Sequence, residues 1–156
     1  MREATICSFF GHRDVEVTEE LRAKTGAEIK NVIDLGCRIF YFGGYGDFDA
    51  LCHEIVTEIQ KETPTLGIHR VYCVSQERYL YKNVRYFKRE SYEEILYLTP
   101  SFEGWYKSIY FRNCAMIDKS HFILFYAEKR ENSGAYLAYQ YAMRKKEKHI
   151  VNLFPR

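Results

Sequence analysis

The sequence YFGGYGDFDALC, from Tyr41 to Cys52, joins the end of an apolar run to the start of an amphipathic run. Three of the nine glycines of the chain, Gly43, Gly44 and Gly46, lie within four positions of this stretch. This order is typical of a strand that leads through a tight turn into a crossover helix of a parallel sheet. The glycines either only turn the chain, or they let a ligand approach the backbone.

Outward from this stretch, short apolar runs alternate with helix-like runs along the chain. Strands are expected over Ala4–Phe10, Arg38–Gly44, Gly67–Ser75, Glu93–Thr99, His121–Ala127 and His149–Phe154. Helices are expected from Thr18 to Gly36, from Asp47 or Asp49 to Pro64, over Gly104–Met116 and over Gly134–Lys146. Continuous apolar strands are typical of parallel sheets that are covered on both faces. The sequence therefore predicts an α/β fold, a Rossmann-like three-layer α/β/α sandwich with a mostly parallel central sheet in the strand order 4-3-2-1-5-6.

Composition limits the classes of protein that fit. The 156 residues suit one domain, residues 1–156, and 47% hydrophobic with 28% charged residues indicate a globular chain. A net charge of +2 gives no reason to expect a nucleic-acid partner. The five cysteines form no CxxC pair, so we expect reduced thiols and no metal site. We see no signal peptide and no membrane-spanning run, and we expect a cytoplasmic protein.

Three loops are expected to form the ligand site, because ligands of open parallel sheets bind beyond the carboxyl ends of the strands. The first loop, GHRD, offers Gly11 for close approach, Arg13 as a fork of donors for phosphate, and His12 as a hydrogen-bonding or titrating group. The third loop, EKRENSG, ends in Ser133 and Gly134 at the start of a helix, where a phosphate can bind. A glycine turn with exposed polar residues is the alternative for the first loop, because loops are usually polar.

The second loop, GGYGDFD, is neither the GxGxxG fingerprint nor a P-loop. Backbone N–H groups of Gly43, Gly44 and Gly46, together with the start of a helix, favour an anion site. Asp47 or Asp49 either caps the helix or accepts hydrogen bonds from ribose hydroxyls. A glycine turn with a capping aspartate is the alternative.

A helical stripe of Trp105, Ile109, Arg112 and Met116 places an arginine among apolar residues. A buried arginine needs a partner, which is either Asp118 or a ligand. Asn113 next to it is a candidate for reading a base or ribose edge. We therefore add Arg112, Asn113 and Asp118 to the candidate ligand-binding residues.

Four motifs, taken in order, resemble those of the SLOG superfamily, which joins the Smf/DprA proteins and the Lonely-guy enzymes. They are FFGHR (Phe9–Arg13), GGYGDFDALC (Gly43–Cys52), RNCAMIDKSHFILFYAE (Arg112–Glu128) and SGAYLAYQYA (Ser133–Ala142). The set is most similar to the small bacterial members of the YpsA type, in which the last three motifs read GGARGxD, RNxxMVDxSD and GGTxxAxxYA. The resemblance spans almost the whole chain and implies a Rossmann-like nucleotide-binding fold.

The departures from this pattern concern activity. His121 replaces the usual aspartate, and the Ser133–Ala135 segment replaces Gly-Gly-Thr and so loses a hydroxyl. The Lonely-guy hydrolase motif PGGxGTxxE, with its glutamate, is absent. The resemblance therefore carries over a fold and no activity, and an enzyme is not expected.

Three functions compete. We expect a nucleotide-binding protein, a ligand sensor or regulator, whose partner is a nucleotide or nucleotide derivative and which needs no other cofactor. An N-glycosidase needs a carboxylate at the site, for which Asp47 is the weak catalytic candidate beside Asp49 and Asp118. A single-stranded DNA binder is the third, with RYLYKNVRYFKR (Arg78–Arg89) as a basic aromatic segment or a solvated flap over the site. Tyr and Phe at the surface make a homodimer possible.

Overall fold

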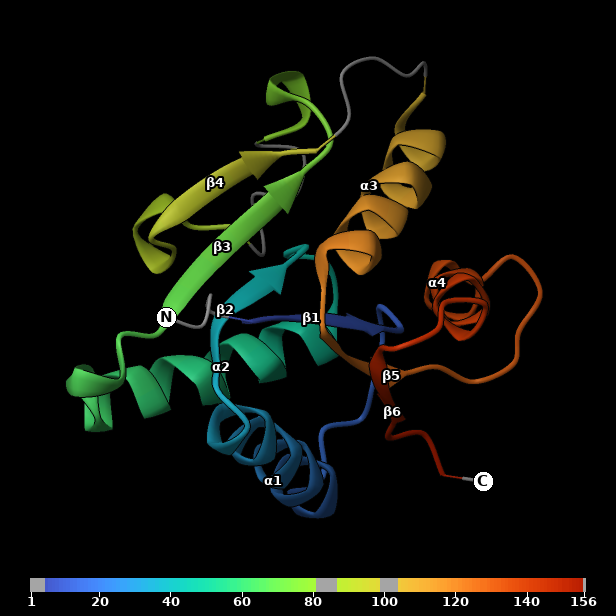
Figure 1. Cartoon of the computed structure of the whole chain (residues 1–156). Coiled ribbons are helices and arrows are strands. Elements are labelled where there is room, and N and C mark those ends of the chain that lie inside the picture. Colours follow the sequence, from blue (N-terminus) through green and yellow to red (C-terminus); the bar gives the residue numbers. More distant parts are fainter. Residues whose placement is uncertain (1–4, 81–86, 99–103, 156) are drawn as a thin grey trace.

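A computed structural model describes residues 5–80, 87–98 and 104–155. Six parallel strands form one sheet in the order β4-β3-β2-β1-β5-β6 (Figure 1). The strands are β1 (Thr5–Gly11), β2 (Cys37–Phe42), β3 (His69–Val74), β4 (Glu94–Tyr97), β5 (Phe122–Tyr126) and β6 (His149–Asn152). The predicted fold class and the predicted strand order are both confirmed.

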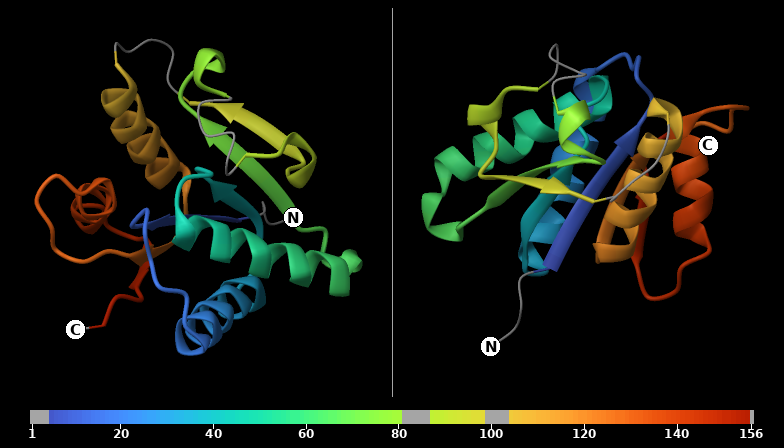
Figure 2. Two further views of the ribbon diagram at one scale, coloured as in Figure 1. Left: turned by 180° about the vertical axis from the view of Figure 1, so that it is seen from behind. Right: turned by 90° about the horizontal axis from the view of Figure 1, so that it is seen from above.

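Four α-helices cover the two faces of the sheet, so the layers are α/β/α (Figure 1). One face carries α1 (Glu19–Asp34) and α2 (Asp47–Glu62), and the other carries α3 (Trp105–Lys119) and α4 (Gly134–Met143). Short 3-10 turns lie at η1 (Pro64–Leu66), η2 (Glu77–Tyr79) and η3 (Arg89–Ser91). Figure 2 shows α3 and α4 packed side by side.

Helix starts follow the sequence signals at two places and depart from them at a third. Thr18 caps α1 by accepting from the N–H of Leu21 at 3.0 Å, as predicted. Ser133 caps α4 in the same way through the N–H of Tyr136. The prediction that Asp47 or Asp49 caps α2 is wrong, because the N-cap is Gly46 and no side chain bonds there.

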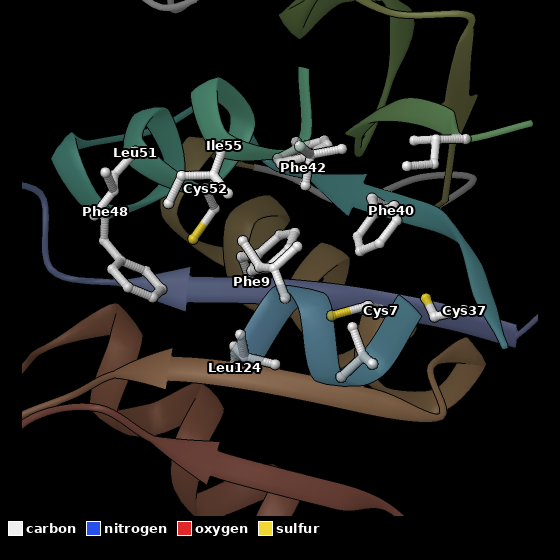
Figure 3. Close-up of a cluster of buried hydrophobic side chains, with 14 of the residues drawn as sticks. Cys7, Phe9, Cys37, Phe40, Phe42, Phe48, Leu51, Cys52, Ile55 and Leu124 are labelled. Carbon is white, nitrogen blue, oxygen red and sulfur yellow. The ribbon is translucent and has the colours of Figure 1, made fainter. Parts of the chain in front are cut away.

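The core beneath α1 and α2 is built from stacked aromatic rings of the central strands (Figure 3). Phe9 of β1 is 2% exposed, and its ring centroid lies 5.2 Å from that of Phe42 and 6.0 Å from that of Phe40. A second cluster, with Phe10 and Phe125, fills the space beneath α3 and α4. Burial on both faces explains why these strands read as continuous apolar runs.

The basic aromatic segment is only partly described, since residues 81–86 lie outside the described ranges. Phe87 is 5% exposed and packs against Tyr72, with 4.3 Å between the ring centroids. Phe87 is therefore a core residue and does not offer its ring to a base. Half of the segment Arg78–Arg89, which the sequence suggested as a flap, therefore lies outside the described residues.

Candidate functional site

A cavity of about 440 Å³ opens beside the carboxyl ends of β1 and β2. Its lining comes from the three predicted loops and from α3, at the point where the strand order reverses around β1. The lining residues are Phe9, Phe10, Gly11, His12, Arg13, Asp14, Gly43, Tyr45, Asp49, Ile109, Arg112, Asn113, Arg130, Glu131, Asn132, Ser133, Gly134 and Ala135. Gly11, Gly43 and Gly134 thus share one cavity, as expected, and its volume suits a small ligand.

The glycine corner after β2 binds a carboxylate of the chain itself. Oδ1 of Asp49 accepts from the N–H of Gly43 at 3.2 Å, and Oδ2 accepts from the N–H of Gly44 at 3.0 Å. Two of the three backbone donors that were expected to face a phosphate, those of Gly43 and Gly44, are therefore occupied. Gly44 also has a φ of +65°, and a Cβ there would overlap Tyr72. At this corner glycine is required by internal packing.

Asp49 is a buried carboxyl, 6% exposed, at the wall of the cavity. Burial raises its pKa to about 7, although the N–H groups of Gly43 and Gly44 and the charge of Arg112 act in the opposite direction. Near neutral pH the group therefore exchanges between a carboxylate and a neutral acid. The sequence indicated Asp49 as a helix cap, as a ribose acceptor, or as a candidate carboxylate for glycosidic hydrolysis.

The amino terminus of α2 is also closed by the chain. The N–H of Asp47 donates to the carbonyl of Arg13 at 2.8 Å, and Oδ2 of Asp47 accepts from the N–H of Val15 at 3.0 Å. These bonds join the first loop to the second and leave Asp47 outside the cavity lining. Gly44 and Gly46 line a smaller cavity of about 240 Å³.

Arg112 lies at the inner wall of the main cavity and is 7% exposed. Its Nη1 donates to the carbonyl of Gly43 at 3.2 Å, while Nε and Nη2 donate to Oδ1 of Asn113 at 3.2 and 2.8 Å. In the described part of the chain Arg112 makes no ion pair. Burial lowers its pKa, but a guanidinium stays charged at neutral pH. The cavity wall therefore holds a buried cation whose hydrogen bonds to described residues all go to neutral oxygens.

Of the two partners that the sequence left open for Arg112, Asp118 is wrong. Asp118 accepts from the hydroxyl of Tyr141 at 2.8 Å and pairs with Lys145 at 3.2 Å. It is exposed and does not line the cavity. The helix α3 precedes β5 and runs antiparallel to the sheet, so its last turn lies at the opposite edge from the cavity.

His12 and Ser133 meet across the cavity in a defined protonation state. Nε2 of His12 lies 2.7 Å from the N–H of Glu128 and accepts from it. In a neutral imidazole the proton is then on Nδ1, which donates to Oγ of Ser133 at 3.3 Å. Burial and the charge of Arg130 lower the pKa of His12, while Glu128 acts in the opposite direction. His12 is therefore a neutral donor at pH 7 and not a base for Ser133.

Ser133 keeps its own proton for a ligand. Its Oγ accepts from His12 and from the N–H of Tyr136 at 3.2 Å, so the O–H can donate elsewhere. The N–H groups of Gly134 and Ala135 follow in the first turn of α4 and have no hydrogen-bond partner within the described residues. This end of the cavity offers donors together with the positive end of the helix dipole.

Exposed arginines stand at the mouth. Cζ of Arg13 lies 5.3 Å from the centroid of the Tyr45 ring. Arg13 makes no ion pair within the described ranges. Arg130 is paired with Glu128 at 2.6 Å. The sequence analysis missed Tyr45 and Arg130 as lining residues. Their only sequence signal was their place in two of the three loops.

Eight of the predicted ligand-binding residues line the cavity, namely Gly11, His12, Arg13, Gly43, Arg112, Asn113, Ser133 and Gly134. Four do not line it, namely Gly44, Gly46, Asp47 and Asp118. Among the described residues, no group of three or more His, Cys, Asp or Glu side chains is placed to hold a metal ion. No helix in the described ranges has the length and apolar character that a membrane crossing needs.

Comparison with known proteins shows a likeness in fold alone. No family model and no curated protein matches the sequence. The structure of DNA processing protein A (DprA) from Streptococcus pneumoniae has a TM-score of 0.59 and 11% identity, and the match covers 94% of this chain and 49% of that one. DprA from Helicobacter pylori, described with its single-stranded DNA binding mode, has a TM-score of 0.60 and 16% identity, covering 94% of this chain and 64% of that one. This chain thus matches about half to two thirds of the length of those proteins.

Proposed function

We propose that the protein binds a nucleoside phosphate or a related nucleotide derivative in the main cavity and does not change it chemically. The observation that carries this proposal is Arg112, which is 7% exposed and whose hydrogen bonds, in the part of the chain that the structure describes, go to Gly43 and Asn113. A buried cation without a counter-charge in contact is costly unless an anion completes it. A phosphate is the anion that such a fork of donors fits.

The phosphate is proposed to lie at the α4 side of the cavity and not at the glycine corner. The N–H groups of Gly43 and Gly44 already donate hydrogen bonds to the carboxylate of Asp49. In contrast, the hydroxyl of Ser133 and the first N–H groups of α4 are available donors beside the same cavity. A helix amino terminus with a hydroxyl donor is a favourable phosphate site.

Arg13 supplies the first test. Because Arg13 is exposed at the mouth, Arg13→Ala removes a charged donor without disturbing the core. We expect the affinity for the preferred nucleotide to fall by about 1.5–3 kcal/mol, the worth of a hydrogen bond to a charged group. Calorimetric titration measures it, with Lys30→Ala on the exposed face of α1 as a control of equal charge. Equal affinities of Arg13→Ala and the unchanged protein would remove Arg13 from the site.

Glycosidic hydrolysis is the competing activity, and we expect none. A glycosidase needs a carboxylate free to act beside the sugar. Asp47 lies outside the cavity lining and holds the N–H of Val15, while both oxygens of Asp49 hold backbone N–H groups. Nucleoside monophosphates incubated with the protein should release free base at the rate of a buffer control. Turnover on the order of 1 per second that disappears in Asp49→Asn or Asp47→Asn would establish an enzyme instead.

Single-stranded DNA binding is the second candidate function. It is supported by the likeness in fold to the Helicobacter pylori protein, whose printed description names that ligand. This likeness speaks against our initial expectation that nucleic acid is not a partner. It also supports a place in the SLOG superfamily. We propose that the protein is a YpsA-type member of that superfamily.

A further inference from the structure

Arg112 allows only one orientation of the side-chain amide of Asn113. An arginine side chain has donors and no acceptor, so the atom of Asn113 that faces Nε and Nη2 of Arg112 must be the carbonyl oxygen. The amide nitrogen then takes the other position and has only hydrogens to offer. Asn113 therefore does not match a base edge that needs both a donor and an acceptor.

The amide nitrogen of Asn113 lacks a hydrogen-bond partner among the residues that the structure describes. The side chain is 7% exposed and lines the cavity, and Nδ2 makes no hydrogen bond in the described ranges. It is also not one of the fully buried polar atoms that lack a partner. The nitrogen therefore reaches accessible space, which here is the cavity. A buried donor that opens on a cavity indicates an acceptor on the ligand.

The cavity has more hydrogen-bond donors than a phosphodiester has non-bridging oxygens to accept from them. Besides Nδ2 of Asn113, the cavity has the hydroxyl of Ser133, the N–H groups of Gly134 and Ala135, and the remaining N–H groups of Arg112. A phosphodiester has two non-bridging oxygens, whereas a terminal phosphate has three and a second negative charge. The donor set matches the terminal group better.

Buried residues form one wall of the cavity. Phe9 and Phe10, which are 2% and 6% exposed, line it together with the buried Arg112 and Asn113. Of the other lining residues, Arg13, Asp14, Asn132 and Gly134 are exposed. We expect a phosphate that contacts Arg112 and Asn113 to carry its substituent toward these exposed residues.

We propose that Asn113, held by Arg112, makes the inner end of the cavity selective for a terminal phosphate over a phosphodiester. This inference rests on the proposed function and narrows it to ligands that end in a phosphate monoester. An internal phosphate of single-stranded DNA does not meet this requirement. Asn113 acts as a specificity-determining residue through its amide nitrogen.

The test compares methyl phosphate with dimethyl phosphate on the full chain, by NMR titration of the side-chain amide of Asn113. We expect methyl phosphate to shift that amide and to bind at least about tenfold more tightly than dimethyl phosphate. A repeat at pH 5 gives both probes nearly one charge, because the second pKa of a phosphate monoester is about 6. The preference should persist there.

The matched substitution is Asn113→Asp, which keeps the oxygen that Arg112 needs and replaces the donor by a negative oxygen. We expect it to fold and to lose at least about 30-fold in affinity for methyl phosphate, measured through backbone amide shifts. Asn31→Asp, on the exposed face of α1, makes the same charge change away from the cavity and should bind as the unchanged protein does.

Three results would overturn the inference and leave phosphate binding in place: equal affinity for the two probes, unchanged affinity in Asn113→Asp, or no shift of the Asn113 amide while phosphate binds. The last result needs no variant and so decides the matter even if Asn113→Asp does not fold. If neither probe nor inorganic phosphate binds the unchanged protein, the proposed function fails together with the inference.

Discussion

Arg112→Ala is expected to remove nucleotide binding and to destabilise the fold. The substitution takes away the buried cation of the cavity wall and leaves the carbonyl of Gly43 and Oδ1 of Asn113 without their donor. Two charge-assisted bonds to a phosphate account for at least about a 100-fold loss of affinity. Leaving these two buried acceptors without a donor costs about 1–3 kcal/mol of unfolding free energy. Calorimetry and urea unfolding measure the two effects.

Asp49 provides an internal check of this result. Arg112 lowers the pKa of Asp49, so its loss should raise that pKa further and keep the carboxyl protonated at neutral pH. The control is Arg22→Ala, which removes an exposed arginine paired with Glu54 at 3.3 Å and should cost at most about 1 kcal/mol. If Arg112→Ala bound nucleotide and unfolded like Arg22→Ala, the role assigned to Arg112 would be wrong.

Glu93→Ala should lower stability by about 3–5 kcal/mol without involving the cavity. Arg70 on β3 donates to Glu93 through Nε at 3.0 Å and Nη2 at 2.7 Å, and its side chain is only 10% exposed. The substitution leaves this guanidinium buried, with the hydroxyl of Thr57 as its remaining side-chain partner. The neighbouring pair of Glu94 with His69 is exposed, so Glu94→Ala is the control and should cost less than about 1 kcal/mol.

The ion pair of Arg70 with Glu93 also predicts how the free energy of unfolding changes at acid pH. Burial alone would raise the pKa of Glu93, but hydrogen bonds from Arg70 and Gln60 outweigh burial and lower it to about 2 from 4.5. The unfolded chain therefore takes up the proton first as pH falls. The contribution is fully present above pH 4.5 and is lost as pH falls toward 2. Unfolding at pH 3 and pH 6 should differ less in Glu93→Ala than in the unchanged protein, and equal differences would contradict this account.

The fold could be predicted from the sequence because each signal was local. Continuous apolar runs such as Phe122–Tyr126 marked buried parallel strands, and Thr18 and Ser133 marked helix starts. The error at the start of α2 has a specific cause. Asp47 and Asp49 both looked like caps, but their carboxylates bond to Val15 and to the glycine corner across the loops.

The loops that form the site could be predicted from the sequence, but the hydrogen bonds within the site could not. Strand order placed the loops with Gly11, Gly43 and Gly134 on one cavity. The contact of Arg112 with the carbonyl of Gly43 joins residues 69 positions apart, and no spacing rule indicates it. Likewise, the tautomer of His12 follows from a backbone N–H that is 116 positions away. Such contacts depend on packing between elements.

The position of Arg112 along α3 determines which side chains it can contact. Arg112 and Asp118 are six residues apart, which on sequence alone suggested an ion pair at one helix end. The side chains lie at different levels of α3, and Asp118 bonds to α4 and the segment after it through Tyr141 and Lys145. The anion for Arg112 is therefore proposed to come from outside the chain.

The central claim is that the main cavity binds a nucleotide through a phosphate. Calorimetric titration of the unchanged protein with a panel of nucleoside 5′-monophosphates tests it most directly, with the corresponding nucleosides as ligands that lack the phosphate. The account predicts at least one monophosphate with a Kd of micromolar order, about −8 kcal/mol, and no measurable binding of its nucleoside. Folded protein that gives no heat with any monophosphate at millimolar concentration, or that binds nucleoside and nucleotide equally, would contradict it.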